Sequence, residues 1–212
     1  MGEKITLLFN GGTIPTKSKD SYINPNNMPE DKGIILGGTI KTVTSDYYYN
    51  PSTYKKAYDD SDFHSSIEAN IYNYMLNAAN EVSVHNMAIQ LHGGRTSKNC
   101  AYFTSELFRR MGIDMPQSTS MVTQVENQLL SVGFKINNNI NDLKPGYTVF
   151  TKRNTHVYTF MGWVNPGQHD YAYIVDNQAV LFSGHVYHVR RIDEPAEDTD
   201  TDPMGFFMYS GN

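Results

Sequence analysis

The spacing of the apolar residues changes once along this chain, near residue 134, and the change restricts the fold that the chain can adopt. Between residues 63 and 133, apolar side chains recur every three or four positions, which is typical of helices that bury one face. After residue 134 the spacing shortens to two, as in strands, and Asn, Pro and Gly separate the apolar runs. Helices followed by an antiparallel meander predict an α+β domain with helices packed on one side of an antiparallel β-sheet.

Local signals sharpen this prediction at several helix ends. Ser65 and Glu68 form a capping-box pattern in front of the first apolar face. The third helix begins at Cys100, which therefore lies in its first turn, and ends before Gly112. Helices are expected over about residues 65–82, 87–91, 100–111 and 120–131, and strands over 147–151, 156–163, 171–176, 185–192 and 206–209.

The first 62 residues have a different texture and contain an internal repeat. Residues 11–26 align without gaps to residues 37–52, and nine of the sixteen positions are identical. Each copy has a Gly-Gly turn and an Asn-Pro stop, so we expect paired hairpins in a small N-terminal β module over residues 1–62, next to a domain over 63–212. The tyrosines of the module can either cover its own thin core or bind a protein or glycan partner.

Composition excludes several classes of protein. With 39% hydrophobic and 18% charged residues, the 212-residue chain is too apolar to be disordered, and it has no apolar run long enough to span a membrane. A net charge of -5 argues against a nucleic-acid partner, and six acidic residues fall within residues 193–202, which we expect to be a solvated loop. No metal and no cofactor is expected, because the seven histidines form no metal-binding motif and one cysteine cannot build a cysteine cage.

That single cysteine occupies a position that favours chemistry. The unpaired amides at a helix N-terminus stabilise a thiolate at Cys100 and can also bind the oxyanion that forms when the thiolate attacks an acyl group. A cysteine nucleophile needs an imidazole and a third group that orients the ring. His156 opens a strand, and Asp176 or Asn177 ends the next one; only one of these two can face His156, because side chains alternate along a strand.

Two segments resemble one family of enzymes. QLHGGRTSKNCAYFTSELFRRMG is similar to the nucleophile segment of the NlpC/P60 and CHAP peptidases, which are papain-like cysteine hydrolases of bacterial peptidoglycan; residues 93–94 and 99–101 fit its Gly-Gly and Asn-Cys pattern. LKPGYTVFTKRNTHVYTFMGW resembles the segment that carries the histidine of the family. The matching positions there are Leu143, Pro145, Gly146, Phe150, His156, Val157 and Gly162.

The resemblance implies a papain-like domain and a role for each matched residue. Cys100 would be the nucleophile and His156 the base, and Asp176 would be the third catalytic residue, with Asn177 as the alternative. Gln90 aligns ahead of the Gly-Gly pair, where its amide can donate to the oxyanion. The chain departs from the family at His92, where a tryptophan is usual, and at Tyr147, where an aspartate is common.

The expected function is therefore hydrolysis of amide bonds in peptidoglycan peptides through a Cys-His-Asp triad. The chain starts without the features of a secretory signal, so we expect it to reach the wall by phage lysis, in a virion or by a non-Sec route, and otherwise to be cytoplasmic. Two alternatives stay open: a structural or binding protein of a virion or surface with an inactive hydrolase-like scaffold, and an acyltransferase or deamidase on the same fold.

Overall fold

A computed structural model describes residues 58–182, 184–196 and 201–211 of the chain. The described residues form four α-helices and a six-stranded antiparallel sheet, which confirms the α+β prediction. Both copies of the repeat lie outside the described residues, as does most of the N-terminal module predicted over residues 1–62.

The helices follow the predicted apolar spacing except at one break. The apolar face expected over residues 65–82 belongs to two helices, because Asn77 ends the first run and caps the next: its Oδ1 accepts from the Ala79 amide at 2.9 Å. The second predicted stretch, residues 87–91, is the end of that next helix. The helices are α1 (Ser66–Met75), α2 (Ala78–Leu91), α3 (Cys100–Arg110) and α4 (Val122–Ser131).

The strands form one sheet in the order β1-β6-β2-β3-β4-β5. Strands β2 to β5 make the predicted meander, and the last strand returns to pair with β2. The three-residue edge strand β1 was not predicted, because the Asn-rich segment that begins in it has the composition of a loop. The strands are β1 (Lys135–Asn137), β2 (Thr148–Thr151), β3 (Val157–Asn165), β4 (Gln168–Val175), β5 (Tyr187–Arg191) and β6 (Met204–Tyr209).

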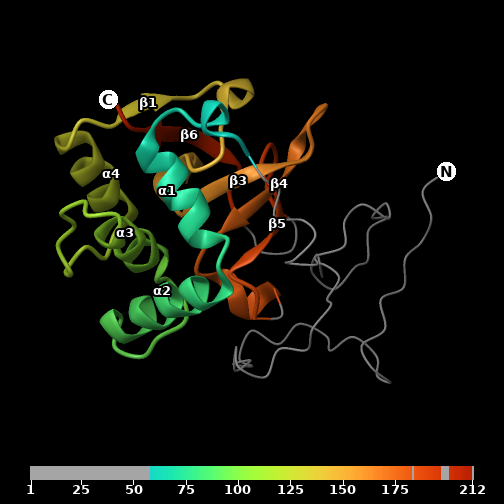
Figure 1. Ribbon diagram of the computed structural model, residues 1–212. Helices are drawn as coiled ribbons and strands as arrows, with labels where there is room; N and C mark the ends of the chain where they lie inside the picture. Colours follow the sequence, from blue (N-terminus) through green and yellow to red (C-terminus); the bar gives the residue numbers. More distant parts are fainter. Residues whose placement is uncertain (1–57, 183, 197–200, 212) are drawn as a thin grey trace, which may run out of the picture.

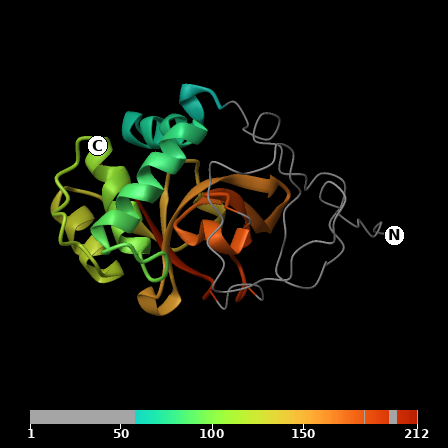
Figure 2. The ribbon, with the colours of Figure 1, turned by 90° about the horizontal axis from the view of Figure 1, so that it is seen from below.

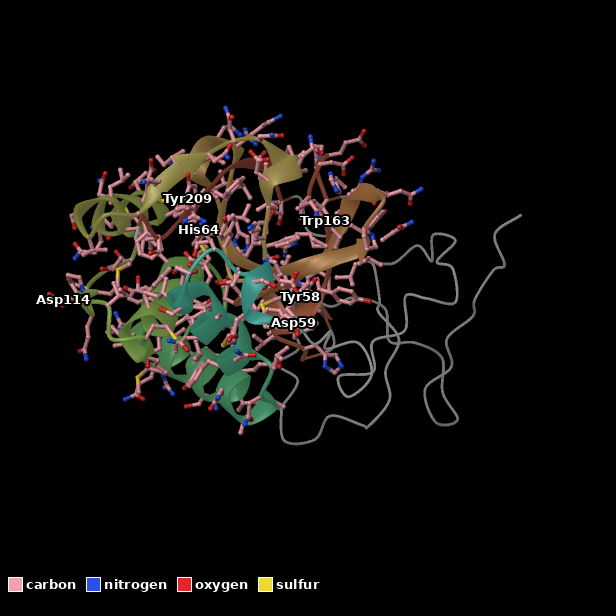
Figure 3. The ribbon with its side chains drawn as sticks, turned by 45° about the horizontal axis from the view of Figure 1, so that its top comes forward. Tyr58, Asp59, His64, Asp114, Trp163 and Tyr209 are labelled. Carbon is pink, nitrogen blue, oxygen red and sulfur yellow. The ribbon has the colours of Figure 1, made fainter. Side chains whose placement is uncertain are left out.

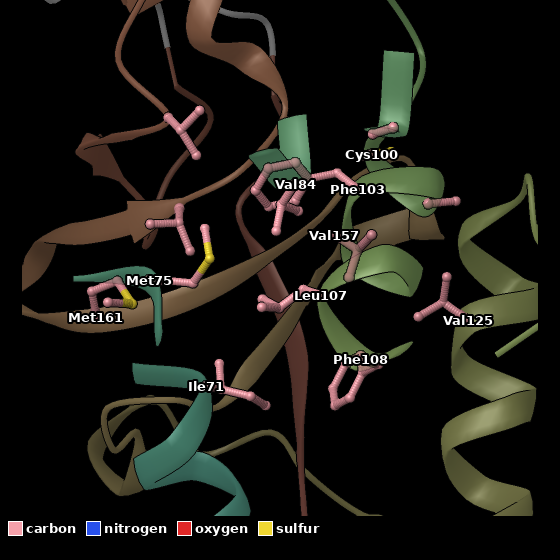
Figure 4. Packing of buried hydrophobic residues seen from close by; sticks show 14 of the residues in the cluster. Ile71, Met75, Val84, Cys100, Phe103, Leu107, Phe108, Val125, Val157 and Met161 are labelled. Carbon is pink, nitrogen blue, oxygen red and sulfur yellow. The ribbon is translucent and has the colours of Figure 1, made fainter. Parts of the chain in front are cut away.

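The helices gather on one side of the molecule and strands β3 to β5 on the other (Figures 1 and 2). The main core lies between them, where Phe103 and Leu107 of α3 are buried in one cluster with Val157 of β3 (Figure 4). A second apolar cluster, which includes Tyr158 and Ile174, lies on alternate positions of the same strands. Both sides of the sheet are therefore buried around β3 and β4.

Polar and aromatic contacts join α1 to the last strand. Glu68 of α1 is buried; its Oε1 accepts from the Ser210 amide at 2.6 Å, and its Oε2 accepts from the Ser65 hydroxyl. The rings of His64 and Tyr209, which are labelled next to each other in Figure 3, have centroids 4.7 Å apart. None of the described helices is long and apolar enough to cross a membrane.

Replacing Leu107 with alanine is expected to lower the free energy of unfolding by about 2–5 kcal/mol, because this fully buried side chain would leave a cavity between α3 and the sheet. Urea unfolding followed by circular dichroism measures the loss. Leu130→Ala, on the exposed face of α4, is the matched control and should change stability by less than about 0.5 kcal/mol. Equal losses in the two variants would contradict the assignment of Leu107 to the core.

Candidate active site

Cys100 is the first residue of α3 and is nearly buried. The side chain of Asn99, the residue before the helix, makes no capping bond to α3; its Oδ1 accepts from Asn177 Nδ2 at 2.5 Å. The backbone amides of Ala101 and of Val157 on β3 both lower the pKa of the Cys100 thiol. The thiol thus meets amides from a helix N-terminus and from the start of a strand, both of which stabilise a negative charge.

His156 lies just before β3, and both its backbone amide and its carbonyl are hydrogen-bonded to Thr151. Its amide donates to Thr151 Oγ1 at 2.9 Å, and its carbonyl accepts from the Thr151 amide at 3.1 Å. In the ring, Nε2 lies 2.7 Å from Asp176 Oδ2, and Cys100 is the other side chain whose interaction with the imidazole raises its pKa. Because Nε2 faces a carboxylate and carries the proton, Nδ1 is the ring atom left for the thiol.

Charges in this arrangement favour a thiolate beside an imidazolium. Burial raises the pKa of the Cys100 thiol, but the hydrogen bond and charge of His156 and the two backbone amides outweigh it, so that the pKa is lowered. Burial lowers the pKa of His156, but Asp176 and Cys100 outweigh it, so that this pKa is raised. The two shifts have opposite signs and both favour transfer of the thiol proton to the ring.

Asp176 is fully buried, one residue beyond the end of β4, and four groups surround its two oxygens. Oδ2 lies next to His156 Nε2 and 2.9 Å from Arg190 Nη1. Oδ1 accepts from the Gln178 amide at 2.7 Å and lies 3.6 Å from His188 Nε2. Burial raises the pKa of this carboxyl, but Arg190, His188 and His156 hold it well below its ordinary value. Asp176 is therefore ionised throughout the neutral range.

His188 is a neutral neighbour of this carboxylate. Burial, only partly offset by Asp176, lowers the pKa of His188 to about 3. Its Nδ1 donates to the His185 carbonyl at 3.2 Å, and its ring stacks on Phe182 with centroids 3.6 Å apart. The 3.6 Å approach to Asp176 is therefore not an ion pair near neutral pH.

The structure thus brings Cys100, His156 and Asp176 together, and it places the other two candidates elsewhere. Asn177 is buried but bonds to Asn99, so of the two alternatives for the third residue Asp176 is the one that faces the imidazole. The Gln90 side chain is exposed near the end of α2, and within the described residues no hydrogen bond joins it to Cys100 or His156. Its role as an oxyanion donor stays a prediction.

Sequence reasoning missed the buried groups on β5 that surround Asp176. His188 and Arg190 are two residues apart and so project to the same face of the strand, and β5 pairs with β4, which leads into Asp176. A fully buried arginine has almost no local signature. The only available signal was an arginine at an inward position of the strand next to the candidate aspartate.

Part of the acidic segment, expected to be solvated, instead holds the turn that precedes His156. This turn is the 3-10 helix η5 (Lys152–Asn154), in which Arg153 has a positive φ of 64°. Asp202 pairs with Arg153 and accepts from the Thr155 hydroxyl at 2.7 Å. These contacts connect the segment after β5 to the residue just before His156.

Comparison with known proteins leaves this geometry as the main basis for inference. No protein-family model matches the chain, and neither the curated proteins nor the solved structures contain a match. Among the residues that the structure describes, no three His, Cys, Asp or Glu side chains are grouped to hold a metal ion.

Alkylation tests the thiolate directly, since Cys100 is the only cysteine of the chain. The rate of reaction with iodoacetamide should rise with pH around a midpoint below the value of about 8.5 for a free thiol. His156→Gln removes the side chain that lowers the pKa of the Cys100 thiol, and it should therefore move the midpoint to higher pH. His169→Gln, which changes a ring that stacks on Trp163, should leave it unchanged. Superimposable pH profiles of all three proteins, measured by mass spectrometry, would contradict an activated thiol.

Buried His188 should make the fold sensitive to mild acid. The native state keeps His188 neutral down to about pH 3, whereas the unfolded chain protonates it near pH 6.5, so the unfolded state binds the extra proton between these values. Each such group lowers the free energy of unfolding by up to about 1.4 kcal/mol per pH unit as the pH falls. His156, whose pKa is raised, is protonated in both states below pH 6.5 and adds no slope there.

His188→Gln should therefore flatten the decline in stability between pH 6.5 and 4.5, a range in which Asp176 stays ionised in both states. The remaining slope belongs in part to His85, whose pKa burial also lowers. Urea unfolding at half-unit pH steps measures the effect, and exposed His64→Gln is the control. An unchanged slope in His188→Gln would show that this ring is not held neutral.

Proposed function

We propose that the chain is a papain-like cysteine hydrolase that cleaves amide bonds in the peptides of bacterial peptidoglycan. The observation that carries the proposal is the grouping of Cys100, His156 and Asp176, which come from a helix N-terminus, a strand start and a strand end and act on one another's protonation. The order of these residues along the chain and their secondary structure agree with the family that the sequence resembles. That resemblance is what points to peptidoglycan as the substrate.

The geometry supports a two-step reaction. The Cys100 thiolate attacks the amide carbon to form a C–S bond, the oxyanion is stabilised by the unpaired amides of the first turn of α3, and the C–N bond breaks as His156 gives its proton to the leaving amine. Water then attacks the thioester carbon while neutral His156 takes a proton from it. The C–S bond then breaks and the acid product leaves, so that the Cys100 thiolate and the protonated His156 of the free enzyme are restored.

Asp176 acts on the imidazole throughout these steps. Accepting the proton of Nε2 fixes the tautomer that directs Nδ1 to sulfur, and it stabilises the ring when it is charged. Asp176 is itself too strongly acidic to take the proton, because Arg190 faces the same oxygen. Its part is to orient the base rather than to relay a proton.

Purified cell walls from several wall types, incubated with the protein and analysed by mass spectrometry, test the reaction. Wild-type protein should release peptides with new amine and carboxyl ends, Cys100→Ala should release none, and Asp176→Asn should lower the rate by about 10²-fold or more. Ser105→Ala, a second buried change in α3, is the matched control and should retain activity.

Two outcomes would separate this proposal from its alternatives. A folded protein with an activated thiol that releases nothing from any wall would point to another acyl substrate. Products in which the acyl group has moved to a new amine, with no gain of water, would identify a transferase instead of a hydrolase.

A further inference from the structure

Asp176 has two cationic partners for one oxygen. His156 Nε2 and Arg190 Nη1 lie 2.7 Å and 2.9 Å from the same Oδ2 atom. A carboxylate that is shared with a permanent cation gives less stabilisation to the imidazolium than one that faces the ring alone.

Arg190 is built into this position. Its side chain is only 1% exposed, and its Nη2 donates to the Gln178 side chain of the segment that follows Asp176. The guanidinium carbon lies 5.7 Å from the ring centroid of Tyr158 and 5.7 Å from that of Phe182. Because the guanidinium is buried and is contacted by Asp176, Gln178 and two rings, the fold fixes its position.

Of the other titratable groups near Asp176, only Cys100 and His156 carry charge at neutral pH. These other groups are His85 of α2, Cys100 of α3, His156 before β3, Tyr158 of β3 and His188 of β5. Burial lowers the pKa of His85 and of His188 and raises that of Tyr158, so each stays neutral. Within the described residues, Arg190 is therefore the one fixed charge that balances Asp176, apart from the charges that Cys100 and His156 exchange.

We propose that Arg190 is a positioning residue that shares the Asp176 carboxylate with His156, so that the imidazole, which has given its proton to the leaving amine, stays neutral in the thioester. The inference rests on the proposed function, because both half-reactions need His156 to change its protonation state. In the free enzyme the thiolate retains the imidazolium. In the thioester the thiolate is gone, and a ring that faced an unshared Asp176 would take up a proton again from solvent and could not activate water.

Titration of His156 in protein whose Cys100 has been carbamidomethylated tests this without any substrate. The alkylated sulfur stands for the uncharged thioester, and the ring protons of His156 are followed by NMR against pH. Arg190→Met keeps an apolar stem between Tyr158 and Phe182 but removes the cation; we expect the midpoint of His156 to rise by about one pH unit or more.

Two matched variants distinguish charge from packing. Arg190→Lys restores a cation and should bring the midpoint back towards the wild-type value. Arg191→Met removes the neighbouring arginine, which pairs with Asp193 and Glu194 instead, and should leave it unchanged. Where Arg190→Met does not fold, Arg190→Gln, which retains a hydrogen-bonding group, makes the same neutral comparison.

A midpoint in Arg190→Met or Arg190→Gln that equals the wild-type value, or falls below it, would overturn the role of Arg190. Because the measurement needs no turnover, that result would leave the hydrolase proposal standing. Conversely, walls that release nothing would defeat the hydrolase proposal without altering the titration. If the hydrolase proposal and the role of Arg190 are both correct, thioester hydrolysis by Arg190→Met should slow more at pH 6 than at pH 8. Simple loss of structure would not produce this pH dependence.

Discussion

The arrangement of the site depends on one buried carboxylate. Removing Asp176 from water costs several kcal/mol unless its oxygens are paired, and the fold meets this cost with groups from β5, from the segment before β3 and from the turn after β4. Those three elements are neighbours because β3, β4 and β5 pair in sequence. The meander is therefore the structure that allows an ionised aspartate to lie beside His156.

A second contact sets the helix against this sheet. Asn99 precedes Cys100 and Asn177 follows Asp176, so their hydrogen bond joins the start of α3 to the end of β4. The Asn99 side chain makes this bond and does not cap α3, although capping is the usual role of an asparagine that precedes a helix. The consequence is that the first amides of α3 stay available to the sulfur of Cys100.

The sequence predicted the parts of this structure that depend on local periodicity. The order of helices and strands, the position of Cys100 in a first turn and the strand-end positions of His156 and Asp176 all follow from spacing of two or of three to four. The break at Asn77 was missed because the apolar spacing continues across it. Arg190 was missed because its contact with Asp176 depends on the register between β4 and β5, which pairs Ala172 with Arg190 and leaves no trace in either segment alone.

Charge balance in the buried set favours proton transfer between Cys100 and His156. Asp176 and Arg190 cancel, and Cys100 and His156 are either both neutral or oppositely charged, so the net buried charge is zero before and after the proton moves. A transfer that changed this net charge would carry a large desolvation cost, whereas one that separates charge over a single hydrogen bond does not. An unbalanced Asp176 would lower the energy of the imidazolium in every state, including the acyl state of the proposed reaction, which needs the neutral ring.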